Sequence, residues 1–274
     1  MTAVCRRWRL VLVAGLVAIL LCQPAPGRAE PPRLRYQATW AGLPAAEIYL
    51  QLDDGDDYFN TRIEIVTLGL PRLLSHFEAR ADSAGAMLPG HSAVPARYDA
   101  KYRLRKKHKQ VSIRYHPDDI GRLAEKGAAD TGDHPLLPER LRRDVLDPLS
   151  CLAEIREMIR KGQLPPGGAF VIPVYDGKRR LDVEGSRLVE PAQPVGLAGK
   201  ALQLRLLLRP IAGFRPDERE DEKIDDKPRE VQVWLSDDPG LIPLRLSVSI
   251  VYLPAVVSFV GECSAALPCK AVMP

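Results

Sequence analysis

Alternation of apolar and polar residues with a period of two runs through most of the chain after residue 33. This pattern is typical of β-strands that bury one face of a sheet. Turn-forming residues, such as Asp53–Asp57 and Asp176-Gly177, separate the alternating segments at the spacing of hairpins. We therefore predict about eleven or twelve strands, mostly joined in antiparallel order. The alternating segments are 34–40, 46–52, 58–68, 73–81, 95–104, 111–115, 169–175, 179–189, 202–208, 231–235, 242–252 and 255–263.

One segment has the periodicity of a helix. Asp147 is a typical N-cap residue, Pro148 suits the first helical position, and Gly162 suits the position after the last turn. The sequence predicts one main helix over residues 149–161, whose apolar stripe packs against a sheet. That stripe consists of Cys151, Leu152, Ile155, Met158 and Ile159. The residues expected on the solvent side are Glu154, Arg156, Glu157 and Arg160.

The first 29 residues have the features of a secretory signal. Three arginines at positions 6, 7 and 9 precede the apolar run 10–21, and small residues lead up to Ala29. The run is shorter than the roughly 20 residues needed to cross a bilayer, so we expect cleavage after Ala29 and no transmembrane span in the mature chain. A retained membrane anchor and a lipid-modified Cys22 are the less favoured alternatives. Residues 30–274 are predicted to form a single β-rich domain, with an acidic mobile loop at 213–228.

The charge balance argues against nucleic acid as a partner. The first 29 residues hold four of the 39 Lys and Arg residues and no acidic residue, so the rest of the chain has equal numbers of basic and acidic side chains. Binding to a phosphate backbone requires a basic surplus. The most basic run, Arg103–Lys109, is predicted to be an exposed hairpin tip. The alternative is a patch for anionic lipid head groups or for an acidic partner.

Three cysteines remain after the predicted cleavage. Cys263 and Cys269 are close enough in sequence to close a small loop by a disulfide in an oxidising compartment, whereas Cys151 is predicted to be a buried thiol. The alternative is that all three are free. No two histidines have the spacing of metal ligands, so we expect neither a metal nor a cofactor. Asp147 and Ser150 are interpreted as a helix start rather than a catalytic pair.

Four segments together resemble a known family. They are 147–150 (DPLS), 174–179 (VYDGKR), 233–238 (VWLSDD) and 242–244 (IPL), preceded by the pattern of residues 36–48. Over residues 34–263 the chain resembles domain-of-unknown-function family 3108, which comprises exported proteins of Gram-negative bacteria. The resemblance implies a periplasmic protein without established activity or catalytic residues. It also implies a mainly β fold, in which a strongly curved antiparallel sheet, a half-barrel or open barrel, packs around one main α-helix.

A curved sheet offers a larger apolar face than one helix can cover, and such cavities hold ligands. We therefore expect a non-enzymatic periplasmic protein that binds a hydrophobic or amphiphilic ligand, such as a lipid or a lipoprotein, within the sheet. The alternative is a cell-envelope scaffold or interaction module with a fully packed core. The candidate cavity residues are Trp40, Tyr49, Leu206, Trp234 and Tyr252.

Overall fold

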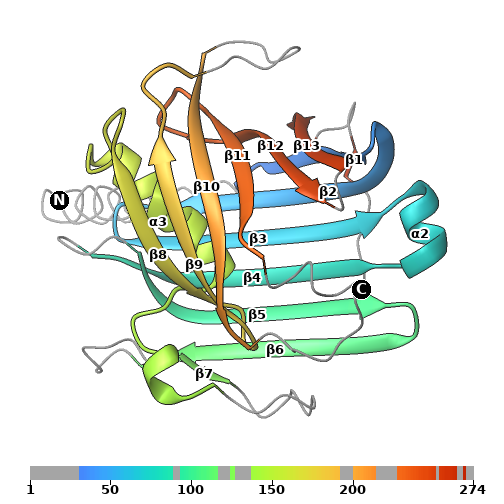
Figure 1. The fold of residues 1–274 in the computed structure, drawn as a ribbon, viewed down its shortest axis with the longest axis horizontal. Helices are drawn as coiled ribbons and strands as arrows, with labels where there is room; N and C mark the ends of the chain where they lie inside the picture. Colours follow the sequence, from blue (N-terminus) through green and yellow to red (C-terminus); the bar gives the residue numbers. More distant parts are fainter. Residues whose placement is uncertain are drawn as a thin grey trace, which may run out of the picture. The chain divides into compact units, whose positions relative to one another are not determined.

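The alternating segments form one antiparallel sheet in the computed structural model of the protein (Figure 1). The structure describes residues 31–88, 93–116, 124–126, 137–191, 200–213, 227–250, 253–263 and 268–269. The predicted signal (1–29), most of the predicted acidic loop (213–228) and Tyr252 lie outside these ranges. The described residues from Pro32 onwards belong to one compact unit.

Thirteen strands are present in the described ranges. They are β1 (Arg33–Trp40), β2 (Leu43–Asp54), β3 (Tyr58–Thr67), β4 (Glu78–Met87), β5 (Ala93–Leu104), β6 (Lys107–Tyr115), β7 (Ala124–Lys126), β8 (Ala169–Tyr175), β9 (Arg180–Arg187), β10 (Ala201–Ala212), β11 (Arg229–Ser236), β12 (Pro243–Ile250) and β13 (Leu253–Glu262). Their order in the sheet is β7-β6-β5-β4-β3-β2-β1-β13-β12-β11-β10-β9-β8. The first and last strands in sequence therefore pair at the centre, and the described edges β7 and β8 do not pair with each other.

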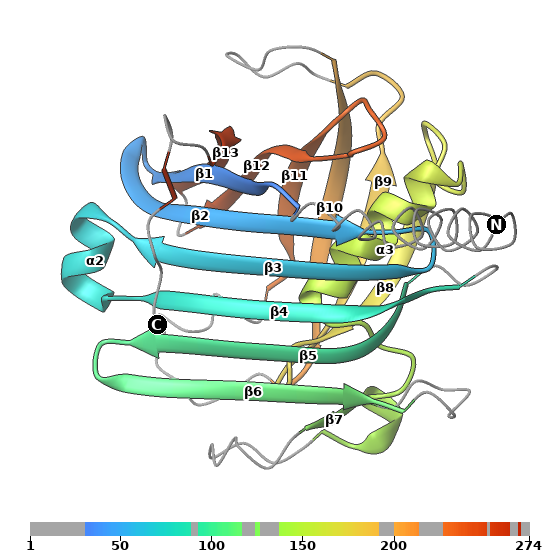
Figure 2. The same cartoon turned by 180° about the vertical axis from the view of Figure 1, so that it is seen from behind.

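The main helix, α3 (Pro148–Arg160), lies inside the curve of the sheet. Figures 1 and 2 show it between the arm formed by β8–β11 and the arm formed by β2–β6. The prediction of a mainly β fold, with a strongly curved and unclosed sheet around one main helix, is confirmed. None of the described helices has the length and apolar character needed to cross a membrane.

The helix packs against both arms at once. Cys151 and Ile155 belong to a core with β8–β11, whereas Leu149 packs with residues of β4–β6. Ala153 contacts the Phe59 and Met87 cluster, and Leu152 packs against the cluster of β1 and β2. Burying a large apolar side chain contributes about 1.5–3 kcal/mol before the loss of entropy is subtracted. The helix is thus the common element of four core clusters.

The prediction that Arg156 faces solvent is wrong. Arg156 is buried, and Glu154 accepts a hydrogen bond from the backbone N–H of Ala93. A helix on a flat sheet would leave its polar side in water. Here the strands continue around that side, so the polar residues meet protein on the far arm.

Two further differences concern short elements. Residues 69–75 form a helix, α2 (Gly69–Ser75), at a position where the strand 73–81 was predicted to begin, and β4 begins only at Glu78. Leu70 and Leu73 are 61% and 72% exposed, so these apolar residues do not form the buried face of a strand. A 3₁₀ turn (Glu139–Leu141) and β7 complete the described elements.

Candidate ligand-binding cavity

A cavity of about 390 Å³, partly open to solvent, lies between the concave face of the sheet and α3. Its walls come from three parts of the fold, namely the strands β1–β3, the helix and the strands β8–β13. The lining side chains are apolar except for Arg245 of β12 and the hydroxyl of Tyr36. Representative residues from the three parts are Tyr36, Leu50, Leu152, Ile155, Leu206 and Leu246.

The cavity exists because the helix is shorter than the sheet it faces. The 13 residues of α3 span about 20 Å at 1.5 Å per residue. The 12 residues of β10 span about 40 Å at 3.3 Å per residue. Along β10, Leu204 is buried beneath the helix, whereas Leu206 and Leu208 on the same face are only partly buried. The uncovered part of the apolar face forms the cavity wall.

Tyr36 brings a polar group to this apolar wall. Its side chain is buried and lines the cavity, and its hydroxyl has no hydrogen-bond partner among the described residues. Burial raises the pKa of Tyr36 well above its ordinary value, and the positive charge of Arg156 partly opposes that shift. Buried polar groups in native proteins normally have partners, so an unpartnered hydroxyl at a cavity calls for an explanation.

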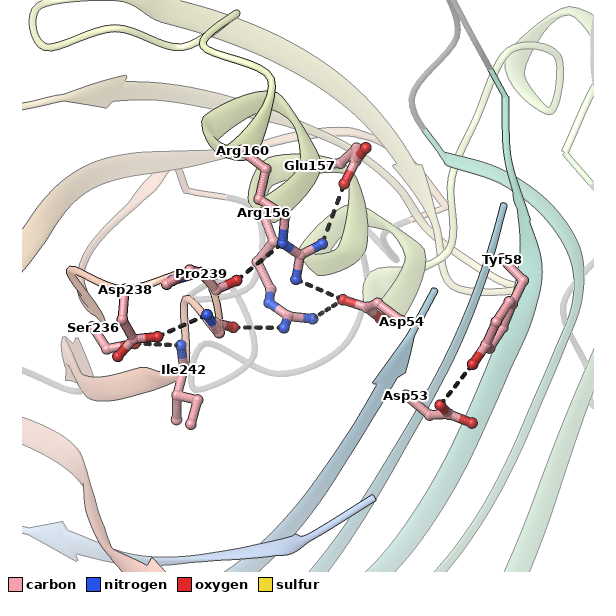
Figure 3. A network of polar contacts seen from close by, with 11 residues as sticks. Asp53, Asp54, Tyr58, Arg156, Glu157, Arg160, Ser236, Asp238, Pro239 and Ile242 are labelled. Carbon is pink, nitrogen blue, oxygen red and sulfur yellow. Dashed lines mark hydrogen bonds and ion pairs between the residues drawn. The ribbon is translucent and has the colours of Figure 1, made fainter. Parts of the chain in front are cut away.

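Arg156 belongs to a polar network beside the cavity (Figure 3). Its guanidinium forms an ion pair with Asp54 of β2 and donates to the carbonyl of Gly240 at 2.7 Å. Arg160 also reaches Asp54, at 2.9 Å, and donates to the carbonyl of Pro239 at 3.2 Å. Burial lowers the pKa of Arg156 to about 10, although the carboxylate of Asp54 opposes this effect. The network joins the helix to the ends of β2 and β11.

Asp147 and Ser150 form the capping box of α3. The Asp147 carboxylate accepts hydrogen bonds from the backbone N–H groups of Leu149 and Ser150, at 2.9 and 3.0 Å, and from the hydroxyls of Ser83 and Ser150. Burial raises the pKa of Asp147, and the hydrogen bonds from Ser150, Ser83 and Leu149 oppose that shift. The carboxylate is completely buried and its hydrogen-bonding capacity is used within the fold.

The other residues that carry the family resemblance also support turns. The side chain of Asp176 accepts from the backbone N–H groups of Lys178 and Arg179, at 2.9 and 2.7 Å, in the β8–β9 hairpin. In the β11–β12 turn, the hydroxyl of Ser236 accepts from Ile242 N–H at 2.8 Å, and Asp238 accepts from Gly240 N–H at 2.7 Å (Figure 3).

The cysteines have two distinct environments. Cys263 and Cys269 are joined by a disulfide, and Cys151 is a buried free thiol on the helix. Burial raises the pKa of Cys151 above its ordinary value, and the negative charges of Asp147 and Glu154 act in the same direction. Among the described residues, no three His, Cys, Asp or Glu side chains are grouped as metal ligands would be.

Of the predicted cavity residues, Leu206 lies in the wall. Tyr49 and Trp234 are buried but adjoin the wall residues Leu50 and Val233, so the alternation of a strand directs them to the opposite face. The Tyr49 hydroxyl donates to Glu47 at 2.8 Å on that face. Trp40 ends β1, is 38% exposed and is not among the lining residues.

Tyr36 was not predicted as a cavity residue, although it lies in the wall. Its position in the alternating pattern of β1 could have identified it. Tyr36 pairs with Ile48 across β1 and β2, and two residues paired in this way share a face. Selecting aromatic residues by size rather than by strand parity favoured Tyr49 instead.

The comparisons with known proteins agree with this fold. A crystal structure of a β-barrel-like protein of domain of unknown function DUF1849, from Brucella abortus, is similar with a TM-score of 0.53 and 12% sequence identity. The similarity covers 86% of this chain and 98% of that one, and at this identity it concerns the fold alone. No curated protein matches the chain. The family described as "Protein of unknown function (DUF3108)" matches residues 35–257, which is most of the sequence. The chain therefore belongs to the DUF3108 family, as the resemblance of its turn and helix-start segments predicted.

Proposed function

We propose that this protein is a non-catalytic periplasmic binder of a hydrophobic or amphiphilic ligand, such as the acyl chain of a lipid or lipoprotein. The observation that carries the proposal is the apolar cavity of about 390 Å³ between α3 and the sheet. Pockets for small molecules typically measure about 300–1,000 Å³ and are lined mainly by apolar side chains. A wall that is apolar over most of its area holds water poorly, so a hydrocarbon chain is the occupant that suits it.

The position of Tyr36 supports an amphiphile over a pure hydrocarbon. Its unpartnered hydroxyl offers one hydrogen bond beside a mostly apolar wall, which also includes Arg245, and the positive charge of Arg156 is close by. An amphiphile with an acceptor such as a carboxylate or ester can place its chain along the leucines of β10 and its polar group at Tyr36. A few well-placed polar groups in an apolar pocket fix the orientation of a ligand.

The structural roles of the side chains that could be reactive support the non-catalytic part of the proposal. The carboxylate of Asp147 accepts hydrogen bonds from the helix start, and Ser150 donates to that same carboxylate. The thiol of Cys151 has a raised pKa, whereas a nucleophilic cysteine requires a lowered one.

The second candidate is a cell-envelope scaffold whose helix fills the sheet completely. That function requires no internal space, so the cavity favours the ligand binder. Recovery of a stable envelope-protein complex, together with a ligand-free cavity, would favour the scaffold.

Native mass spectrometry of the protein, isolated from the periplasmic fraction without detergent, tests the proposal. We expect an additional mass that extracts into organic solvent. Replacing Leu206 by Trp fills the cavity from its wall and should abolish this mass and the binding of a fluorescent fatty acid. Leu207→Trp is the matched control, because Leu207 is the next residue of β10 and faces the other side of the sheet. Equal ligand binding by both variants, or no binding by the wild-type protein, would contradict the proposal.

A further inference from the structure

Six large apolar side chains are exposed at one end of the sheet. They lie on the β1–β2 turn, on α2, on the β5–β6 turn and at the start of β13, which meet at the same ends of neighbouring strands (Figures 1 and 2). The six residues are Trp40, Leu43, Leu70, Leu73, Leu104 and Leu253. Together with the basic residues named below, they form what we call the α2 surface. They are more than half of the large apolar residues that are exposed in the described part of the chain. Such clustering is unlike the scattered apolar residues of an ordinary surface.

Backbone hydrogen bonds hold these segments together. Ala41 N–H donates to the carbonyl of Pro254 at 2.9 Å, which ties the β1–β2 turn to β13. Leu68 N–H donates to Ala45 at 2.7 Å and so fixes the start of α2 against β2. The β5–β6 turn is joined to the end of α2 through a bond from Arg105 N–H to Ser75, at 2.8 Å.

The same end is strongly basic. Five exposed Lys and Arg side chains lie among the exposed leucines, and the segments 40–44, 69–77, 104–109 and 253–254 contain no Asp or Glu. The five residues are Arg72, Arg105, Lys106, Lys107 and Lys109. Among the described residues, Lys106, Lys107 and Lys109 have no carboxylate partner, so their charges are available to an external anion.

Acidic side chains are exposed on two turns at the opposite ends of the strands. Asp56 and Asp57 are exposed on the β2–β3 turn, and Asp237 and Asp238 are exposed on the β11–β12 turn. Arg160 contacts both turns, through Asp54 and the carbonyl of Pro239, so these acidic residues lie at one end. An anionic surface would attract the α2 surface and repel the acidic end, and would thereby orient the molecule.

We propose that the α2 surface docks the protein on a membrane with anionic head groups. Exposed Trp and Leu side chains enter the boundary between head groups and acyl chains, while flanking Lys and Arg side chains contact the lipid phosphates. A symmetric contact between the α2 surfaces of two copies of this chain would bring positive charges together and be repelled. The apolar side chains also project from separate turns and a two-turn helix, which suits a fluid lipid surface better than one fitted protein groove. The proposal does not depend on a ligand in the cavity.

Co-flotation of the full chain with vesicles tests this docking. We compare vesicles of phosphatidylcholine alone with vesicles that contain 30% phosphatidylglycerol, at low and high salt. One variant reverses the charges of Lys106, Lys107 and Lys109 to Glu, and a second replaces Leu70 and Leu73 by Ser. The matched controls reverse Lys101, Arg140 and Lys200 to Glu, and replace Val171 and Val189 by Ser. All of these control residues are exposed and lie outside the α2 surface. The N-terminal segment is identical in every variant, so any binding by that segment cancels in the comparison.

We expect salt-sensitive binding to the anionic vesicles and at least tenfold weaker binding to phosphatidylcholine. Reversing the three lysines should weaken binding by roughly a hundredfold or more, since each basic residue near an anionic surface contributes about a fivefold factor. The Leu70 and Leu73 variant should lose at least fivefold, and both control variants should bind as the wild-type protein does. Failure of the wild-type protein to bind, or equal losses in the variants and their controls, would overturn the proposal. If the α2 surface bound an acidic protein and vesicles did not compete with that binding, the surface would be assigned to a protein partner. This result would also overturn the proposal.

Discussion

The carboxylate of Asp54 and the guanidinium of Arg156 form an ion pair that is almost completely buried, with 6% and 4% of the two side chains exposed. Asp54 ends β2, whereas Arg156 lies in the third turn of α3, about a hundred residues later in the chain. The pair therefore joins the helix to one arm of the sheet, and the contacts of Arg160 with Asp54, of Asp147 with Ser83 and of Glu154 with Ala93 add to it.

Removing the guanidinium of Arg156 should leave the buried carboxylate of Asp54 with only the more exposed Arg160 as a cationic partner. We expect Arg156→Met to lower the free energy of unfolding by about 3–5 kcal/mol, as is usual when one partner of a buried pair is lost. Arg160→Met is the control, because Arg160 reaches the same carboxylate but is more exposed, and it should cost less than about 1 kcal/mol. Urea denaturation measures both values. Similar losses in the two variants would show that burial does not set the strength of the Arg156 contact.

The β8–β9 hairpin touches the far arm of the sheet at Gly177. This residue has φ +93°, and a Cβ added there would lie 2.3 Å from Cγ1 of Val111 in β6. We expect Gly177→Ala to destabilise the protein by more than about 1 kcal/mol beyond the cost of a positive φ alone. Gly42 has φ +80° with open space around it, so Gly42→Ala measures the cost of the positive φ. Adding Val111→Ala should partly rescue Gly177→Ala in thermal unfolding but leave Gly42→Ala without rescue. If the rescue fails, the two arms do not meet at this contact.

The raised pKa of Asp147 has a definite consequence for the pH dependence of stability. The folded protein retains this proton to higher pH than the unfolded chain, whose Asp titrates near pH 4. The contribution of this residue to stability is therefore largest below pH 4, and it falls as the pH rises through the folded pKa.

Asn caps a helix about as well as Asp and does not ionise. We expect Asp147→Asn to gain stability relative to the wild-type protein as the pH rises from about 4 through the raised pKa of Asp147. Urea denaturation across this range checks the sign, and the opposite trend would indicate a lowered pKa. Asp147→Ala should lose about 1–2 kcal/mol at every pH, because the cap itself is removed.

The features that the sequence predicted well are those that neighbouring residues determine. The capping box and the turn at Asp176-Gly177 depend on side chains that bond to backbone groups two or three residues away. Strand faces follow from parity alone, which is why the leucines of β10 were placed correctly on one side. The curvature was predicted from the family resemblance, whereas the open edges β7 and β8 emerge only from the structure.

The features that the sequence did not predict depend on how far the sheet curves. Arg156 has the helical position of a solvent-facing residue, and only the second arm of the sheet converts it into a buried one. Tyr36 and Tyr49 are both aromatic residues of alternating strands, and both are buried, so neither size nor burial distinguishes the cavity face from the opposite face. The helix α2 was not predicted because its exposed leucines were read as the apolar positions of an alternating strand.

The buried thiol of Cys151 should be inert in the folded protein. Thiolate is the reactive form, and burial together with nearby carboxylates raises the pKa of this cysteine. We expect no modification by iodoacetamide at neutral pH in native buffer, and modification of Cys151 once urea unfolds the protein. Peptide mass spectrometry identifies the modified residue. Rapid labelling of Cys151 in the folded protein would show that the helix leaves its place between the two arms.

Replacing Tyr36 by Phe separates the cost of its hydroxyl from its use. An unpartnered buried hydroxyl contributes nothing to folding and loses its hydrogen bonds to water, so we expect Tyr36→Phe to leave the ligand-free protein as stable or up to about 1 kcal/mol more stable. The same change should weaken binding of a fatty acid about tenfold, because the carboxylate loses a hydrogen-bond donor.

Tyr49→Phe is the matched control on the opposite face. It removes a hydroxyl that donates to Glu47, so it should cost about 1 kcal/mol of stability and leave ligand binding unchanged. Urea denaturation of the delipidated protein and titration with a fluorescent fatty acid give the two readouts. If Tyr36→Phe destabilises the protein as much as Tyr49→Phe and binding is unaffected, the hydroxyl of Tyr36 belongs to the fold and not to a ligand.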